Sequence, residues 1–347
     1  MRVLTAGDQF VSNALLAAAL RAELGETKLD IAELTLPWPH EPFGPVGNVH
    51  EASGTEEQLI EALGNAEAVA TEMAPFTDRV FAADPELRLV AVARGGPVNV
   101  DLAAATRHGV AVTFTPGRNA AAAAEFAVGL MLAAMRKITL SDTCLKAGQW
   151  RGDLYAYDEA GTELDGSTVG LVGYGAIGRI VARVLTAFGA HVLVADPYAD
   201  PAGIAADGVE LVELDDLLRR SRVVSLHARL TESTRNLIDA DKLALLPADA
   251  VLVNTARGGL LDYAAVTDAL RAGRLGALAL DVYDVEPPPA DWPLRDFPNV
   301  VATSHLAGAT RETAERAARI VAAEVGRLAR GEPLRHLANP DVGAGPA

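Results

Sequence analysis

The sequence has little cysteine, few aromatic residues and a deficit of positive charge. Its single cysteine, Cys144, cannot form an intrachain disulfide or a cysteine-rich zinc site, and its surroundings favour a structural role over a nucleophilic one. Lysine and arginine number 30 against 46 aspartate and glutamate residues, which gives a net charge of −16. Nucleic acids and anionic membranes both require a basic surface. We therefore expect neither as a partner. We also expect no bound metal and a cytoplasmic location.

Long hydrophobic runs are also missing. The longest, Ala120 to Met135, is interrupted by Glu125 and is shorter than the roughly 20 residues that a membrane span needs, so we interpret it as a buried or interface helix. The apolar run Leu15–Leu20 is too short and too late for a signal peptide. What is present is a globular composition, and a length of 347 residues predicts two domains.

The first region alternates between strand and helix patterns. Short apolar runs predict strands, and the spacing of Thr55 and Gln58 predicts a capping box at the start of a helix. We expect residues 37–54, rich in proline and glycine, to form a long loop. The expected strands are Arg2–Thr5, Val69–Thr71 and Leu89–Ala93.

From Ser167 onward the alternation is clearer, with helical patterns between six short apolar runs. Continuous apolar strands separated by helices are typical of a doubly wound parallel sheet that is buried on both faces. Residues 310–330 predict a long helix that returns to the first domain, and we expect the tail from Asn339 to fray. The six runs are Thr168–Val172, His191–Ala195, Arg222–Leu226, Val251–Asn254, Leu278–Leu280 and Val300–Thr303.

A glycine-rich turn follows the first of these six strands. Gly173 allows the tight turn, Gly175 lets the backbone approach a pyrophosphate, and Gly178 lets the helix pack closely on the strand. Asp196 ends the next strand, where a carboxylate binds the ribose hydroxyls and repels a 2′-phosphate. This favours NAD over NADP. Flavin and S-adenosyl ligands use similar turns, and a turn without ligand is a further alternative.

Polar side chains follow the later strands at the edge where open parallel sheets bind ligands. They are Arg257, Asp281, Glu286 and His305. Arginine offers a planar fork to a carboxylate, histidine exchanges protons near neutral pH, and a carboxylate beside the imidazole orients it. The set therefore suits hydride transfer involving a 2-hydroxy acid, with Arg257, Glu286 and His305 as the catalytic residues.

Each of these residues has an ordinary structural alternative. Arg257 could be a surface ion-pair partner, Glu286 a solvated loop residue beside three prolines, and His305 a core histidine. Their joint placement after successive strands of one sheet favours the catalytic interpretation. The other histidines lack such placement, although the loop that carries His40 and His50 could face a cleft.

Four motifs in this order resemble those of the D-isomer-specific 2-hydroxyacid dehydrogenase family, which includes phosphoglycerate dehydrogenases and glyoxylate/hydroxypyruvate reductases. The resemblance covers nearly the whole chain. It implies two doubly wound parallel-sheet domains: a Rossmann NAD-binding domain, residues 117–309, inserted into a flavodoxin-like substrate domain, residues 1–116 and 310–347. The motifs are residues 173–179, 254–259, 281–287 and 305–308.

The resemblance also implies residue roles. Arg257 binds the substrate carboxylate, His305 is the acid/base, and Glu286 is its partner, while a small 2-hydroxy or 2-oxo acid is the substrate. A homodimer is implied, with residues 120–137 at or near the interface. The implied substrate contacts are Arg94, Gly95, Gly96, Arg257 and His305. The implied NAD contacts are Gly173, Tyr174, Gly175, Ala176, Ile177, Gly178, Arg179, Asp196, His227, Thr255, Ala256, Arg257, Asp281, His305, Ala307 and Gly308.

The chain departs from the family pattern at Pro97, Arg229 and Ser304, which leaves the substrate open. No arginine cluster for a phosphate occurs in residues 38–77, although Arg94 and Arg118 keep a phosphorylated substrate open. Two other functions remain as alternatives. One is a catalytically silent NAD-sensing or regulatory protein on the same fold, and the other is a related NAD enzyme such as a formate or phosphite dehydrogenase.

Overall fold

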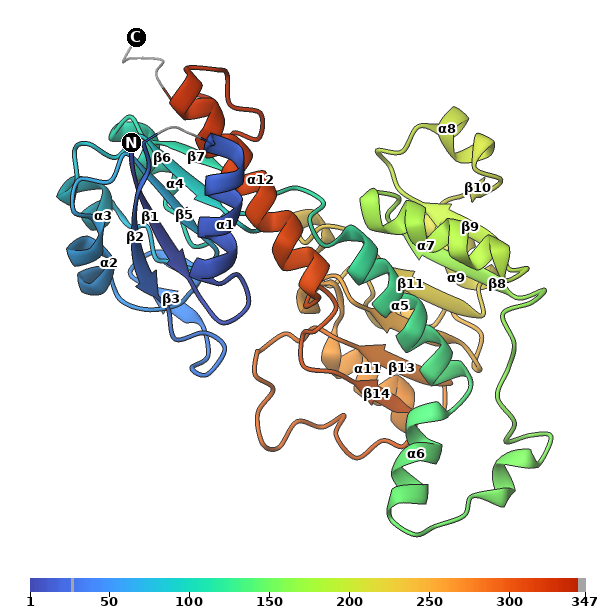
Figure 1. Cartoon of the computed structure of the whole chain (residues 1–347). Coiled ribbons are helices and arrows are strands. Elements are labelled where there is room, and N and C mark those ends of the chain that lie inside the picture. Colours follow the sequence, from blue (N-terminus) through green and yellow to red (C-terminus); the bar gives the residue numbers. More distant parts are fainter. Residues whose placement is uncertain (26–27, 343–347) are drawn as a thin grey trace. The chain divides into compact units, whose positions relative to one another are not determined.

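The computed structural model describes residues 1–25 and 28–342, and residues 343–347 of the expected frayed tail lie outside this range (Figure 1). The chain divides into two compact units. Unit 1 comprises residues 1–119 and 309–347, and unit 2 comprises residues 120–308. Among the described residues, no helix combines the length and apolar character that a membrane crossing requires.

Unit 1 is built on a five-stranded parallel sheet with the order β2-β1-β5-β6-β7. Val3 of the interior strand β1 is in register with Ile31 of β2 and Ala68 of β5. The strands are β1 (Arg2–Gly7), β2 (Asp30–Thr35), β5 (Ala68–Thr71), β6 (Leu89–Val92) and β7 (Ala111–Thr113). The helices are α1 (Asn13–Leu24), α2 (Glu56–Leu63), α3 (Asp78–Ala83), α4 (Leu102–Arg107) and α12 (Arg311–Arg330).

Helices cover both faces of this sheet because its strands are apolar on both sides. One face packs on α1 and α12, which lie side by side in Figure 1 although unit 2 separates them in the sequence. The other face packs on α2, α3 and α4. Thr55 and Gln58 form the predicted capping box at the start of α2. Thr310 caps α12, and this helix belongs to the same compact unit as residues 1–119.

The expected long loop over residues 37–54 is partly wrong. A two-stranded antiparallel hairpin lies within it, formed by β3 (Gly44–Val46) and β4 (Val49–Ala52). The strands are three and four residues long, too short for a periodicity to stand out. Strand β2 was not predicted either, and its partly exposed residues mark it as one of the two edge strands of the sheet.

Unit 2 holds a seven-stranded parallel sheet with the order β10-β9-β8-β11-β12-β13-β14. The strands are β8 (Thr168–Val172), β9 (His191–Ala195), β10 (Glu210–Leu211), β11 (Val223–Leu226), β12 (Val251–Asn254), β13 (Ala277–Leu280) and β14 (Val300–Ala302). The α-helices are α5 (Ala120–Met135), α6 (Ile138–Lys146), α7 (Ala176–Ala187), α8 (Pro201–Ala206), α9 (Leu214–Arg220), α10 (Ala240–Leu243) and α11 (Tyr263–Arg271). Short 3-10 turns are η1 (Gly152–Tyr155), η2 (Glu232–Thr234) and η3 (Gly258–Leu260).

Helices α5 and α7 cover one face of this sheet, and α9, α10 and α11 cover the other. The strand order reverses direction between β8 and β11, which makes their carboxyl ends the topological switch point where such sheets bind ligands. Two parallel sheets, each covered on both faces, confirm the predicted doubly wound α/β class, with a Rossmann unit inserted into a second unit.

Candidate functional site

The glycine-rich turn after β8 has the backbone that its sequence predicts. Gly173 adopts a φ of 103°, and a Cβ atom there would lie 2.8 Å from backbone atoms of His227 and Ala228. A Cβ on Gly178 would lie 2.4 Å from the carbonyl oxygen of Gly173. A Cβ on Gly175 would instead face open space. Gly173 and Gly178 therefore allow close packing, and Gly175 leaves the turn accessible to a ligand.

Helix α7 begins at this turn. Its N-cap is Gly175, so no side chain caps the first N–H groups of the helix, which are free to bind an anion. Asp196 at the end of β9 accepts hydrogen bonds from the backbone N–H groups of Tyr174 and Tyr198, at 2.8 and 2.9 Å. The carboxylate is thus held beside the turn. Arg179 lies over the Tyr174 ring, with 5.4 Å between the guanidinium carbon and the ring centroid.

His227 follows β11, on the other side of the switch point. Its Nε2 lies 3.0 Å from Oγ of Ser225, and its backbone packs against Gly173. Burial lowers the pKa of His227 to about 4, so the imidazole is neutral at neutral pH. A neutral ring next to the turn fits the predicted lining role better than an acid/base role.

Arg257 lies in the loop after β12, and the buried side chain of Asn254 shapes that loop. The Asn254 amide donates to the carbonyl oxygen of Arg257 at 2.9 Å, and its Oδ1 accepts from the N–H of Ala256 at 3.0 Å. Arg257 is exposed, and among the described residues no carboxylate forms an ion pair with it. Its charge is therefore available to an anion. Thr255 and Ala256, both predicted NAD contacts, lie in the same loop.

Glu286 and His305 come together although they follow different strands. The Nδ1–H group of His305 donates to Oε2 of Glu286 at 2.7 Å. Oε1 of Glu286 accepts from the N–H of Tyr283 at 2.9 Å, which fixes the carboxylate. His305 adopts a φ of 54°, a left-handed conformation that is uncommon outside glycine and is frequent at functional sites.

Asp281 fixes the conformation of the loop that carries His305 through hydrogen bonds. Its fully buried carboxylate accepts hydrogen bonds from Thr303 Oγ1 at 2.6 Å and from the N–H groups of Leu306 and Ala307, both at 2.8 Å. Tyr283 supports the same loop by donating to the carbonyl oxygen of Thr303 at 2.6 Å. These positioning roles of Tyr283 and Thr303 could not be predicted from the sequence, because nothing in the spacing of the two residues indicates that they contact each other.

The interaction between His305 and Glu286 shifts their pKa values in opposite directions. The hydrogen bond that His305 donates to Glu286 raises the pKa of His305 above its usual value, despite the opposing effect of burial. Burial alone would raise the pKa of Glu286, but the hydrogen bond and charge of His305, with smaller contributions from Tyr283 and Arg257, lower it. Both shifts favour the charged forms, an imidazolium beside a carboxylate, and they leave Nε2 as the ring nitrogen that does not face Glu286.

The predicted substrate loop of unit 1 follows β6. Gly95 and Gly96 are exposed, and a Cβ atom on either would meet no neighbour within 4 Å. The Arg94 side chain, in contrast, contacts both the carboxylate and the backbone carbonyl oxygen of Glu51. The loop can offer its backbone N–H groups to a ligand, while the guanidinium is engaged within the unit.

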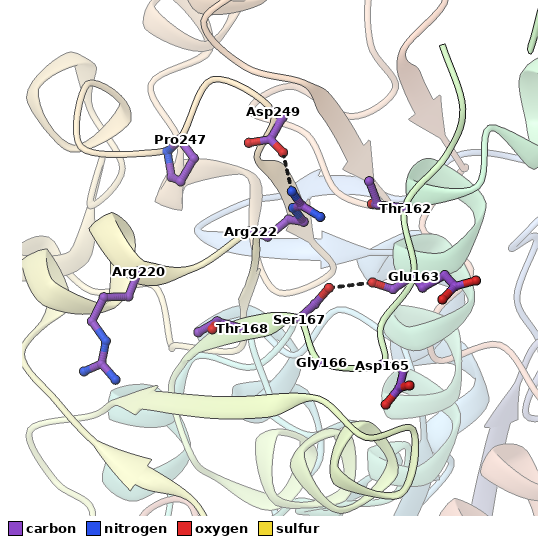
Figure 2. Close-up of a pocket in the computed structure, with 10 residues that line it drawn as sticks. All are labelled: Thr162, Glu163, Asp165, Gly166, Ser167, Thr168, Arg220, Arg222, Pro247 and Asp249. Carbon is purple, nitrogen blue, oxygen red and sulfur yellow. Dashed lines mark hydrogen bonds and ion pairs between the residues drawn. The ribbon is translucent and has the colours of Figure 1, made fainter. Parts of the chain in front are cut away.

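A separate open pocket of about 610 Å³ lies at the other end of the unit 2 sheet (Figure 2). Thr168 and Arg222 in its lining mark the amino ends of β8 and β11, and Arg222 pairs with Asp249 at 2.9 Å. None of the predicted site residues line it. Ligands of open parallel sheets bind at the carboxyl ends, so we do not assign this pocket to the candidate site.

The glycine turn, the uncapped helix start and Asp196 together fit a dinucleotide. Gly175 leaves room for a pyrophosphate, α7 presents N–H groups to it, and Asp196 provides a carboxylate for ribose hydroxyls. Next to this turn the same edge carries an exposed arginine and a carboxylate–imidazole pair. The fold and site define an NAD-binding α/β protein with a carboxylate–imidazole pair at its cofactor edge.

Comparison with known proteins identifies the family. Residues 128–307 match the model of the D-isomer specific 2-hydroxyacid dehydrogenase NAD binding domain. The chain is 37% identical over 293 residues to a glyoxylate reductase from Korarchaeum cryptofilum, covering 84% of this chain and 88% of that protein. This protein therefore belongs to the D-isomer specific 2-hydroxyacid dehydrogenase family, and the predicted family and cofactor are confirmed.

Other similarities extend this result. The chain is 42% identical over 287 residues to D-3-phosphoglycerate dehydrogenase from Mycobacterium leprae, covering 82% of this chain and 53% of that protein. It thus spans about half the length of that relative. The crystal structure of the TT0316 protein from Thermus thermophilus superposes with a TM-score of 0.81 at 30% identity, covering 97% of this chain and all of the other.

Proposed function

We propose that the protein interconverts a D-2-hydroxy acid and the corresponding 2-oxo acid, with NAD as the hydride carrier. The observation that carries the proposal is the 2.7 Å hydrogen bond between His305 and Glu286 at the carboxyl edge of the Rossmann sheet, beside the exposed Arg257. Family membership and the fit of the glycine turn to a dinucleotide support it. Unit 2 is then the NAD-binding domain and unit 1 the substrate domain.

In this proposal Arg257 binds and orients the substrate carboxylate through its planar fork of donors. When bound beside the glycine turn, NAD would supply the acceptor for the hydride from C2 in oxidation, and NADH the donor in reduction. His305 takes the proton from the hydroxyl group as the hydride leaves, or gives a proton to the carbonyl oxygen as the hydride arrives. Because Nδ1 faces Glu286, the ring nitrogen that exchanges this proton is Nε2.

Glu286 has two tasks in this mechanism. It holds the imidazole ring in one orientation, and it stabilises the imidazolium that forms when His305 accepts a proton. The hydrogen bond from the Tyr283 N–H group keeps the carboxylate in place while the charge on the histidine changes. The proposal also includes the predicted NAD contacts. It includes the Arg94-Gly95-Gly96 loop as a contact of the substrate.

The test is an NADH-oxidation screen with purified protein against glyoxylate, hydroxypyruvate, phosphohydroxypyruvate and longer sugar-derived 2-oxo acids. We expect turnover with at least one of them and, in the reverse direction, oxidation of the D isomer only. Binding of NADH without turnover of any 2-oxo acid would instead support an NAD-sensing protein. Oxidation of formate or phosphite would assign a different reaction to the same fold.

We further propose that the protein is a cytoplasmic homodimer in which the segment after α5 lies at the interface. This segment leaves apolar side chains 53 to 95% exposed. A second copy would cover them, in line with the predicted interface near α5. The exposed side chains are Ile138, Leu145, Trp150, Tyr155 and Tyr157.

Sedimentation analysis tests this arrangement. We expect the wild-type protein to sediment as a dimer and the double variant Trp150→Asp/Tyr155→Asp to dissociate into monomers. Phe188→Asp, at another half-exposed apolar position of unit 2, serves as the control and should remain dimeric. A wild-type monomer at micromolar concentration would refute the proposed dimer.

A further inference from the structure

Two arginines lie at the carboxyl edge of the unit 1 sheet, and each is paired with a carboxylate. Arg94 follows β6 and contacts Glu51 of the β3–β4 hairpin through both the carboxylate and the carbonyl oxygen of that residue. Arg118 lies in the turn after β7, with its Nη2 atom 2.7 Å from Oε1 of Glu72. These are the two cations that the sequence leaves available for a phosphate group, and both are compensated within the unit.

A second carboxylate lies beside Glu72. Asp8 follows β1 and is 3% exposed, and Glu72 follows β5 and is 4% exposed. Oδ1 of Asp8 accepts hydrogen bonds from the N–H groups of Phe10 and Val11, both at 2.7 Å. Each carboxyl group affects the pKa of the other, and Arg118 acts on the pKa of both. The buried cluster therefore contains two acids and one base.

Burial makes the electrostatics of this cluster strong. It raises the pKa of Asp8 and raises that of Glu72 to about 7, and it lowers the pKa of Arg118. At neutral pH the two acids can share one proton, which leaves one negative charge opposite the arginine. At higher pH both are charged. In either state the cluster has no positive charge left for an anionic ligand.

The position of the two carboxylates matters as much as their charge. In the order β2-β1-β5-β6-β7, the chain passes from β1 to β2 on one side and continues from β5 on the other. The carboxyl ends of β1 and β5 therefore flank the topological switch point of this sheet, which is where open α/β sheets bind ligands. Asp8 and Glu72 follow these two ends. Acidic side chains therefore occupy the positions where a phosphate group would require basic ones.

We propose that unit 1 selects against a phosphorylated substrate, with Glu72 and Glu51 as specificity-determining residues that neutralise Arg118 and Arg94. The substrates are then 2-hydroxy and 2-oxo acids whose remaining carbons carry no phosphate. The inference rests on the proposed dehydrogenase function and narrows its substrate class. It sets the chain apart from relatives named for a phosphorylated substrate, despite 42% identity to one of them.

The test compares kcat/KM for hydroxypyruvate and phosphohydroxypyruvate, which differ only by the phosphate, with NADH at pH 8, where Glu72 is largely ionised. Glyoxylate, which has no further carbon, serves as the reference substrate. We expect the wild-type enzyme to prefer hydroxypyruvate by about 100-fold or more, since two unfavourable charge contacts of about 1.4 kcal/mol each give that ratio.

Two variants then remove the carboxylate charge beside each arginine, one at a time. Glu51→Gln removes the negative charge that neutralises Arg94, and Glu72→Gln removes the one paired with Arg118, whose buried Nη1 has no acceptor among the described residues. Each should raise the phosphohydroxypyruvate to hydroxypyruvate ratio by about tenfold, mainly through a lower KM for the phosphorylated substrate. Asp78→Asn, which breaks the exposed Asp78–Arg107 pair of the same unit, should leave the ratio unchanged.

The outcomes separate this inference from the proposed function. If no 2-oxo acid is reduced, the dehydrogenase proposal fails. If glyoxylate is reduced but kcat/KM of the wild-type enzyme is as high for phosphohydroxypyruvate as for hydroxypyruvate, the dehydrogenase proposal stands and only this inference is wrong. Equal changes for all three substrates in both variants would show a structural role and would also overturn it. Should Glu72→Gln fail to fold, the wild-type ratio and the partly exposed Glu51→Gln variant still decide the question.

Discussion

The Nδ1 atom of His305 lies 2.7 Å from the Oε2 atom of Glu286, although the two residues follow different strands of the unit 2 sheet. Neither side chain is held by the other alone. Asp281 fixes the loop that carries the histidine, and the N–H group of Tyr283 fixes the carboxylate. A carboxylate–imidazole pair supported on both sides has a defined geometry before any ligand binds.

Replacement of His305 by alanine should lower kcat/KM for 2-oxo acid reduction by at least about 100-fold, because the proton donor is lost. NADH affinity, measured by fluorescence titration, should change little. His191→Ala, at an exposed position at the start of β9, is the matched control and should retain activity. Near-normal turnover in His305→Ala would remove the histidine from the mechanism.

Glu286→Gln should move the pH profile of reduction toward lower pH. The hydrogen bond that His305 donates to Glu286 is the largest contribution that raises the pKa of His305, and reduction requires the protonated ring. Activity is therefore present below the pKa of His305 and is lost as the pH rises through it, and in the variant this loss should begin at a lower pH. An unchanged profile with lower turnover would mean that Glu286 acts by position only.

Arg257→Ala should raise KM for the 2-oxo acid by about 10- to 100-fold, the effect of losing one charge-assisted contact of about 1.5–3 kcal/mol. Arg257→Lys keeps the charge but not the planar fork, so it should recover only part of the loss. Steady-state kinetics at saturating NADH separates KM from kcat. Equal KM values in all three proteins would exclude Arg257 as the carboxylate-binding residue.

Asp196→Ala should reduce the preference for NADH over NADPH, since the carboxylate that repels a 2′-phosphate is removed. The ratio of kcat/KM for the two cofactors is the measurement. Because Asp196 also holds the N–H groups of Tyr174 and Tyr198, we expect weaker NADH binding as well. A constant cofactor ratio would show that this carboxylate only supports the turn.

Gly258→Ala should damage the site without touching a reacting group. A Cβ atom there would lie 1.9 Å from the carbonyl oxygen of Tyr283, so the Arg257 loop and the Glu286 turn must move apart. We expect a loss of about 1–3 kcal/mol of stability together with lower activity. At Gly259 the nearest neighbour is a Leu230 side-chain atom at 3.0 Å, so Gly259→Ala should be milder in thermal unfolding.

The sequence was informative where physical constraints are local. Apolar runs identified all the longer strands of unit 2, and the spacing of Thr55 and Gln58 identified a helix start. The hairpin of β3 and β4 escaped prediction because its strands are short and lie in a segment rich in proline and glycine. Edge strand β2 escaped because half-exposed residues blur the pattern.

The site shows the same division. Motifs and strand order placed Arg257, Glu286 and His305 on one edge, but no spacing could show that Asp281 turns its carboxylate to the His305 loop. Likewise, nothing in the sequence links Glu72 to Arg118, or Glu51 to Arg94. Such contacts depend on how the elements pack, and only the three-dimensional arrangement reveals them.

The insertion of unit 2 into unit 1 has a consequence for biosynthesis. Unit 2 is continuous, so its core can close while the chain is still being made. Unit 1 cannot finish, because α12 covers one face of its sheet beside α1 and is synthesised after the whole of unit 2. Until then the part of this apolar face that α1 leaves uncovered stays open to water, and a nascent chain stalled before residue 311 should be the form most in need of a chaperone.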